Sequence, residues 1–145
     1  MPRLRSYLRF TPALSALLFA STLLVCSGVT KAAAQHEFAF KQYEQFHDAL
    51  HPLQHDALPN NDFKTIRAAS RLLVKRGNAI IALGVPRPTA KKGRQELNIE
   101  LMKFRKALRQ FRADALRGSD AQLKTSFSAL HDSFETLAGM IGVRG

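Results

Sequence analysis

The sequence predicts an all-α protein, an antiparallel up-down-up-down bundle of four helices that follows a cleaved signal peptide. Three observations predict this fold. After residue 35 the chain has no stretch that alternates polar and apolar residues as strands do. Apolar residues instead recur at helical spacing in four long segments. The connections between these segments are short, which forces neighbouring helices to run antiparallel.

The first 34 residues have the three parts of a secretory signal peptide. Three arginines precede an apolar run from Ala13 to Cys26, and small residues follow up to Ala34. The apolar run is shorter than the ~20 residues of a membrane-spanning helix. Cleavage after Ala34 would remove the only cysteine, together with four basic residues and no acid, so the net charge would fall from +11 to +7. We therefore expect residues 35–145 to form a periplasmic or secreted domain without a transmembrane segment.

The first helix is expected over about 37–56 and the second over about 62–83. The turn at 59–61 separates them, and an Asn or Asp at this point can cap the second helix. Gly84 and the following Pro86 end the second helix, because Gly accepts a left-handed backbone and Pro cannot continue a helix. The expected apolar residues of the two helices are Phe46, Ala49, Leu50, Leu53, Ala57, Ile66, Leu72, Leu73, Ile80, Ile81 and Leu83.

The third helix is expected to begin between Thr89 and Gln95 and to end at Arg117, before a glycine. Ser119 and Gln122 then form a capping box, in which each side chain satisfies a free backbone N–H of the other residue. The fourth helix runs to about residue 141. The expected apolar residues of these two helices are Leu97, Leu101, Phe104, Leu108, Phe111, Leu116, Leu123, Phe127, Leu130, Phe134, Leu137 and Ile141.

Three histidines, His47, His51 and His55, follow one another at intervals of four residues on the expected first helix. At about 100° per residue, each is turned by only about 40° from the one before, so all three share one stripe beside the apolar one. Imidazoles four residues apart on a helix can close on one metal ion. In the alternative interpretation the row is solvated and binds nothing, and Pro52 kinks the helix and turns His55 away.

A further histidine, at position 131, flanks the apolar stripe of the expected fourth helix. If the first and fourth helices run antiparallel with Phe38 level with Ile141, residue 131 lies level with residue 48. Histidines from two helices then meet at one height, which predicts a site for a transition metal ion. Imidazole suits both copper and zinc, and we favour copper slightly. The candidate metal ligands are His47, His51, His131, His55 and Glu44.

The segment from Leu123 to Phe134 resembles the last-helix region of exported four-helix-bundle proteins of the cytochrome c prime type. The resemblance implies the bundle fold and export, and it places His131 at the haem-ligand position. Phe127 and Leu130 stand where the CxxCH motif of that family has its cysteines, so haem cannot be attached covalently. The resemblance leaves, as the alternative to a metal ion, a noncovalent haem held by His131 and His47. A ligand-free envelope interaction or stress module is a third hypothesis.

The remaining features exclude the commonest enzyme classes. The chain has no CxxC, GxGxxG, P-loop, HExxH or GxSxG motif, and serines inside a helix lack free N–H groups for an oxyanion hole, so we expect no enzyme. The expected third helix is basic, but it has no aromatic stacking pattern for nucleic acid. We interpret it as a solvated face that is attracted to anionic membrane surfaces. We expect a monomer or a weak homodimer.

The signal peptide makes a direct prediction. Export should remove the basic segment, so N-terminal sequencing of the exported protein is expected to begin near Gln35. Retention of Arg3 to Arg9 in the exported protein would show that the segment is not cleaved.

Overall fold

The computed structural model describes residues 38–86 and 91–141. The expected signal peptide, Cys26 and the expected cleavage site lie outside these residues. The described chain forms four α-helices, which are α1 (Lys41–Pro52), α2 (Phe63–Leu83), α3 (Lys91–Arg117) and α4 (Asp120–Ile141). A π-helical turn, η1 (Leu53–Ala57), continues α1. The described residues contain no strand, so the predicted all-helical class is confirmed.

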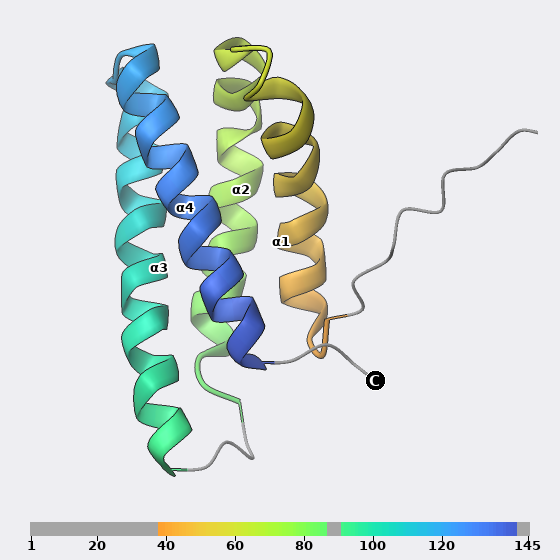
Figure 1. Ribbon diagram of the computed structural model, residues 1–145, viewed down its shortest axis with the longest axis vertical. Helices are drawn as coiled ribbons and strands as arrows, with labels where there is room; N and C mark the ends of the chain where they lie inside the picture. The colour runs from red at the N-terminus through yellow and green to blue at the C-terminus, as the bar shows by residue number, and fades with distance from the viewer. Residues whose placement is uncertain (1–37, 87–90, 142–145) are drawn as a thin grey trace, which may run out of the picture. The chain divides into compact units, whose positions relative to one another are not determined.

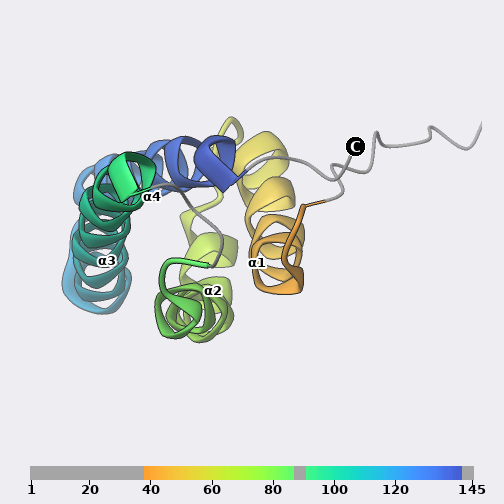
Figure 2. The same ribbon diagram turned by 90° about the horizontal axis from the view of Figure 1, so that it is seen from below.

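The helices pack as neighbours in chain order. Within the compact unit that begins at residue 34, α1 packs on α2, α2 on α3 and α3 on α4. Figures 1 and 2 show α4 crossing the other helices at a tilt, from a start beside α3 to an end near α1. Helix α4 therefore contacts both α3 and α1.

One apolar core lies between the four helices. Its largest fully buried side chains are aromatic and come from all helices except α2: Tyr43, Phe46, Phe104, Phe111, Phe127 and Phe134. Helix α2 contributes Ile66, Leu73 and Ile80 instead, together with the buried Gly77. A Cβ added to Gly77 would lie 2.7 Å from Leu108 Cδ2, so this glycine lets α2 approach α3 closely.

The predicted helix caps are confirmed. The Asp62 carboxylate accepts hydrogen bonds from the backbone N–H of Thr65 at 3.0 Å and from its hydroxyl at 2.6 Å, and these bonds lower the pKa of Asp62. At the start of α4, the Ser119 N–H donates to Gln122 Oε1 at 2.8 Å and the Gln122 N–H donates to Ser119 Oγ at 3.3 Å. This reciprocal pair is the expected capping box.

Two details of the sequence prediction were wrong. The first helix begins at Lys41 and not near residue 37. Leu116 and Leu72, expected among the apolar contacts, are 65% and 44% exposed. The neighbouring Ala115 and Leu73 take the buried positions, and a step of one residue turns a side chain by about 100° out of the core. No helix among residues 38–86 and 91–141 is both long and apolar enough to cross a bilayer.

Replacement of Leu130 by aspartate tests the core. Leu130 is fully buried, so Leu130→Asp would bury a charge without a partner and is expected to cost at least about 4 kcal/mol of the free energy of unfolding. Leu116→Asp, at an exposed position, is the matched control and should change stability by less than about 0.5 kcal/mol. Equal effects in thermal unfolding would show that the buried face of α4 is assigned incorrectly.

Candidate functional site

The three histidines of the first helix form a continuous row. The ring centroids of His47 and His51 are 5.3 Å apart, and those of His51 and His55 are 4.3 Å apart. His51 and His55 are exposed, whereas His47 is half-buried at the inner end of the row. The predicted common stripe is therefore present, and solvent reaches two of its three rings.

The π-helical turn keeps the row together beyond Pro52. Proline has no N–H to donate to the preceding turn, so the regular α-helical bonding pattern is interrupted at this point. The backbone then widens to five-residue turns, in which the N–H of Leu58 donates to Leu53 O at 2.8 Å and that of Asp62 to Ala57 O at 2.9 Å. His55 remains next to His51 across this change, contrary to the alternative in which Pro52 turns it away. Single π-turns are frequent at functional sites.

Aromatic contacts fix the inner end of the row against α4. The His47 ring lies 5.3 Å from that of Phe38 and 6.4 Å from that of Phe134, centroid to centroid. Phe134 also lies 4.8 Å from Phe46. His131, on α4 like Phe134 and three residues before it, belongs to the same region of the bundle. Its side chain is 23% exposed.

Asp132 orients the α4 histidine. His131 Nδ1 lies 3.2 Å from Asp132 Oδ1, within hydrogen-bonding distance. This contact leaves Nε2 of the ring for another partner. A histidine with one nitrogen on a carboxylate and the other available is the arrangement found in many metal ligands.

The candidate ligands do not converge on one point. Among residues 38–86 and 91–141, no three His, Cys, Asp or Glu side chains are grouped closely enough to bind one ion together. The structure thus brings His47, His51 and His55 together as adjacent pairs, but it does not gather His131 or Glu44 with them. Adjacent imidazoles of the row are near enough to each other to act as a ligand pair. A third ligand for the same ion would require a change of its side-chain rotamer.

Sequence reasoning missed Tyr43, which lies one turn before His47 on the same side of α1. Its ring is buried against Phe134, with centroids 6.1 Å apart. The Tyr43 hydroxyl is buried and has no hydrogen-bond partner among the described residues, and burial raises its pKa well above the ordinary value. Tyr43 is therefore a neutral phenol under the histidine row. An unpaired buried hydroxyl depends on tertiary packing and has no signal in the sequence.

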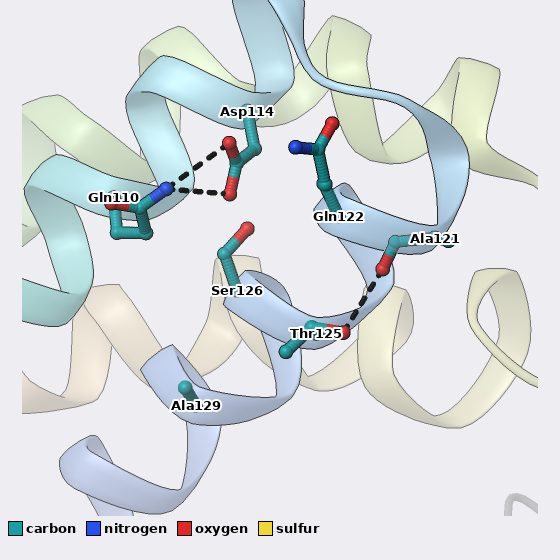
Figure 3. Close-up of a pocket in the computed structure, with 7 residues that line it drawn as sticks. All are labelled: Gln110, Asp114, Ala121, Gln122, Thr125, Ser126 and Ala129. Atoms are coloured by element: carbon teal, nitrogen blue, oxygen red, sulfur yellow. Dashed lines mark hydrogen bonds between the residues drawn. The ribbon is translucent and has the colours of Figure 1, made fainter.

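A groove between α3 and α4 contains the second concentration of polar groups (Figure 3). Asp114, only 8% exposed, accepts hydrogen bonds from Gln110 Nε2 on both carboxylate oxygens, at 3.2 and 3.0 Å. The Ser126 hydroxyl donates to Leu123 O at 3.3 Å, and Gln122 Oε1 already accepts the bond that caps α4. These polar groups are already hydrogen-bonded within the helices that carry them or at the cap of α4, so we assign no ligand to the groove.

Arg67 of α2 binds the connection between α3 and α4. This residue, too, was not identified from the sequence. Its guanidinium donates to the backbone oxygens of Asp114, Ala115 and Gly118 at 2.9, 3.0 and 2.9 Å, and to Asp120 Oδ1 at 2.8 Å. Two of these carbonyls belong to the last turn of α3 and the third to Gly118 just after it, where the helix dipole favours a cation. The Asp114 carbonyl also accepts the Gly118 N–H at 2.8 Å, so it is shared by two donors. Arg67 thus joins α2, α3 and α4 in one contact.

Comparison with family models, with curated proteins and with solved structures finds no match to this chain.

Replacement of Arg67 tests its role in the turn. Arg67→Met keeps the aliphatic stem but removes four hydrogen bonds to carbonyl and carboxylate oxygens, and we expect it to lower the free energy of unfolding by about 2 kcal/mol. Arg71→Met, on an exposed face of the same helix, is the control and should leave stability nearly unchanged. Chemical denaturation measures both, and equal stabilities would contradict the assignment.

Proposed function

We propose that the protein is an exported antiparallel four-helix bundle that binds a divalent transition metal ion through its histidine row. The single observation that carries this proposal is the continuous row His47–His51–His55, with ring centroids 5.3 and 4.3 Å apart. Imidazole is a good ligand for copper and zinc, and copper is slightly favoured. Two exposed rings give an incoming ion direct access.

Metal coordination within the row requires changes of side-chain rotamer that bring the ring nitrogens of neighbouring histidines together. Ligand nitrogens about 2 Å from an ion must approach one another to about 3–4 Å, and side-chain rotamers of exposed residues change on the picosecond to nanosecond timescale. His51 and His55 have the shortest ring separation and form the primary pair. His47 is less free, because its ring packs on Phe38 and Phe134. We assign it as the third ligand of the row.

His131 is proposed as the ligand from α4. The contact of its Nδ1 with Asp132 leaves Nε2 as the coordinating atom, and Phe134 brings this part of α4 against His47. Glu44, exposed and one turn before His47, is proposed as an additional oxygen ligand or as a group that orients His47.

The up-down-up-down topology is supported by the short connections between helices, residues 58–62 before α2 and 118–119 before α4. Export is supported by the signal-peptide pattern of residues 1–34. A mature chain without cysteine also suits an oxidising compartment, since it has no thiol to oxidise.

We favour an ion over a noncovalent haem because of the core near His131. Phe127 and Leu130, which stand at the positions of the missing haem-attachment cysteines, are fully buried. Their side chains fill the space beside the helix that a macrocycle would need. An ion on the solvent side of the row requires no such space.

Calorimetric titration with Cu²⁺ and Zn²⁺, on protein without a His tag, tests the proposal. We expect binding close to one equivalent in the wild type and its loss when His51→Ala and His55→Ala are combined. His131→Ala should weaken binding by at least about tenfold, as expected for a removed ligand or orienting group. Gln45→Ala, at an exposed position of α1, is the control and should bind as the wild type does.

The same variants separate the two parts of the proposal. Equal affinity of wild type and His131→Ala would restrict the site to α1 and η1. Undiminished binding by the His51→Ala, His55→Ala variant would contradict the proposed site as a whole. Because neutral imidazole is the coordinating form, affinity should fall in acid, and added metal should raise the melting temperature in a concentration-dependent way.

A further inference from the structure

The outer face of α3 carries an unusual stripe, which is independent of the histidine row. Three arginines, Arg105, Arg109 and Arg112, lie between Met102 and Leu116 at alternating intervals of three and four residues. Such spacing places all five side chains on one side of the helix. We call these five residues the α3 stripe. Over fourteen residues it extends about 21 Å along the helix.

The apolar ends of the α3 stripe are the most exposed large hydrophobic side chains of the described chain. Met102 and Leu116 are both 65% exposed, whereas the other exposed members of this class lie between 39% and 46%. The exposure of large apolar side chains to water is unfavourable, and covering them with a partner lowers the free energy. Leu116 was expected on or beside the apolar stripe of this helix, and the structure places it on the exposed side.

The cations of the α3 stripe have no partner within the described chain. Lys103 pairs with Glu100 at 2.7 Å and Arg67 is used by the α3–α4 turn, but none of the three stripe arginines has a hydrogen bond or ion pair with a described residue. The same holds for Lys106 and Arg117 beside the stripe. Five unpaired cations on one helix face produce a strongly positive local potential.

The stripe lies on an exposed side of α3, about 100° around the helix from the buried row. The buried side of α3 is formed by Leu97, Leu101, Phe104, Leu108 and Phe111, which pack against the other helices. Figure 2 shows α3 at one side of the helix group, with α2 and α4 as its neighbours, so its outer side is not covered by another described helix.

We infer that the α3 stripe docks on an anionic phospholipid surface, with α3 lying along the plane of the membrane. The arginines contact lipid phosphates, for which the planar guanidinium is well suited, and Met102 and Leu116 enter the boundary of the acyl chains. Basic residues near an anionic bilayer are attracted by its surface potential, and apolar side chains add burial to this attraction.

The composition of the stripe favours lipid over nucleic acid. Proteins that bind single strands stack bases on aromatic side chains, and the described outer face of α3 has none. Two exposed aliphatic side chains at the ends of an arginine run contribute nothing to phosphate recognition on a duplex, whereas they do contribute to insertion in a bilayer. The inference does not depend on metal binding.

Co-sedimentation of the full chain with vesicles, in the presence of a metal chelator, tests the inference. The vesicles are phosphatidylcholine with or without phosphatidylglycerol. The stripe variant combines Arg105→Gln, Arg109→Gln and Arg112→Gln. The matched control combines Lys64→Gln, Arg71→Gln and Lys75→Gln, three exposed cations of α2. Both variants change the net charge equally and keep the same N-terminal segment, so differences between them report the stripe.

We expect the stripe variant to lose about a hundred-fold in affinity for vesicles with phosphatidylglycerol, because each basic residue at such a surface contributes about a factor of five. The control should lose less than about threefold, since charges away from the surface are screened. Binding should weaken with salt and with the pair Met102→Ser and Leu116→Ser.

Three results would overturn the inference. If the wild type binds vesicles with and without phosphatidylglycerol with the same affinity, the anionic surface is not the partner. Equal losses in the stripe variant and the α2 control would assign binding to net charge. Tighter binding to duplex DNA or RNA than to vesicles, unaffected by Met102→Ser and Leu116→Ser, would assign the stripe to nucleic acid.

Discussion

The ring of Phe134 is the contact on which the rest of the bundle depends. It lies 4.8 Å from Phe46 and 6.1 Å from Tyr43 on α1, and 6.4 Å from Phe104 on α3, so one α4 side chain joins three helices. Tilted and stacked aromatic pairs at such distances stabilise the fold beyond the burial of their area. The same ring lies 6.4 Å from His47. Any site that uses histidines of both α1 and α4 therefore depends on a junction inside the core, because Phe134 determines how closely the two helices approach.

The π-helical turn after Pro52 affects whether His55 can belong to the same row as His47 and His51. A proline in a regular helix leaves a carbonyl of the preceding turn without its donor and bends the axis. Here the backbone forms hydrogen bonds between residues five apart, the last of them donated by Asp62. The Asp62 carboxylate then caps the N-terminus of α2. His51 and His55 consequently remain neighbours on either side of the proline. The irregular turn thus preserves a row that a sharp kink would divide, which connects backbone chemistry with the proposed ligand pair.

The sequence predicted features whose cause is local or periodic, and missed those whose cause is tertiary. Helical spacing predicted the buried Leu130 and Phe134, and capping chemistry predicted Asp62 and the Ser119–Gln122 pair, because neighbouring residues determine both. Arg67 had no signal, since the carbonyls it binds lie 47 to 51 residues away in the chain. Leu116 was placed on or beside the apolar stripe of α3, because periodicity cannot decide which of the two adjacent apolar residues, Ala115 or Leu116, faces the core. For the candidate site, the histidine row was predictable, whereas the orientation of each ring depends on packing.

The distribution of charge gives a physical reason for placing the two proposed functions on different helices. The proposed mature chain, with a net charge of +7, repels divalent cations in general, and the cations of α3 contribute to this effect. Helix α1 with η1 has the opposite balance, because its only lysine, Lys41, stands against Glu44, Asp48 and Asp56, and these acids are exposed beside the histidines. Screening over about 10 Å in salt limits the influence of distant charges, so the charges close to each surface dominate its potential. At α1 these include Arg76 of α2, whose guanidinium donates to Gln45 O. Under the two proposals, a metal ion would be attracted to the histidine row and an anionic lipid surface to the α3 stripe, so the two surfaces would not compete for the same partner.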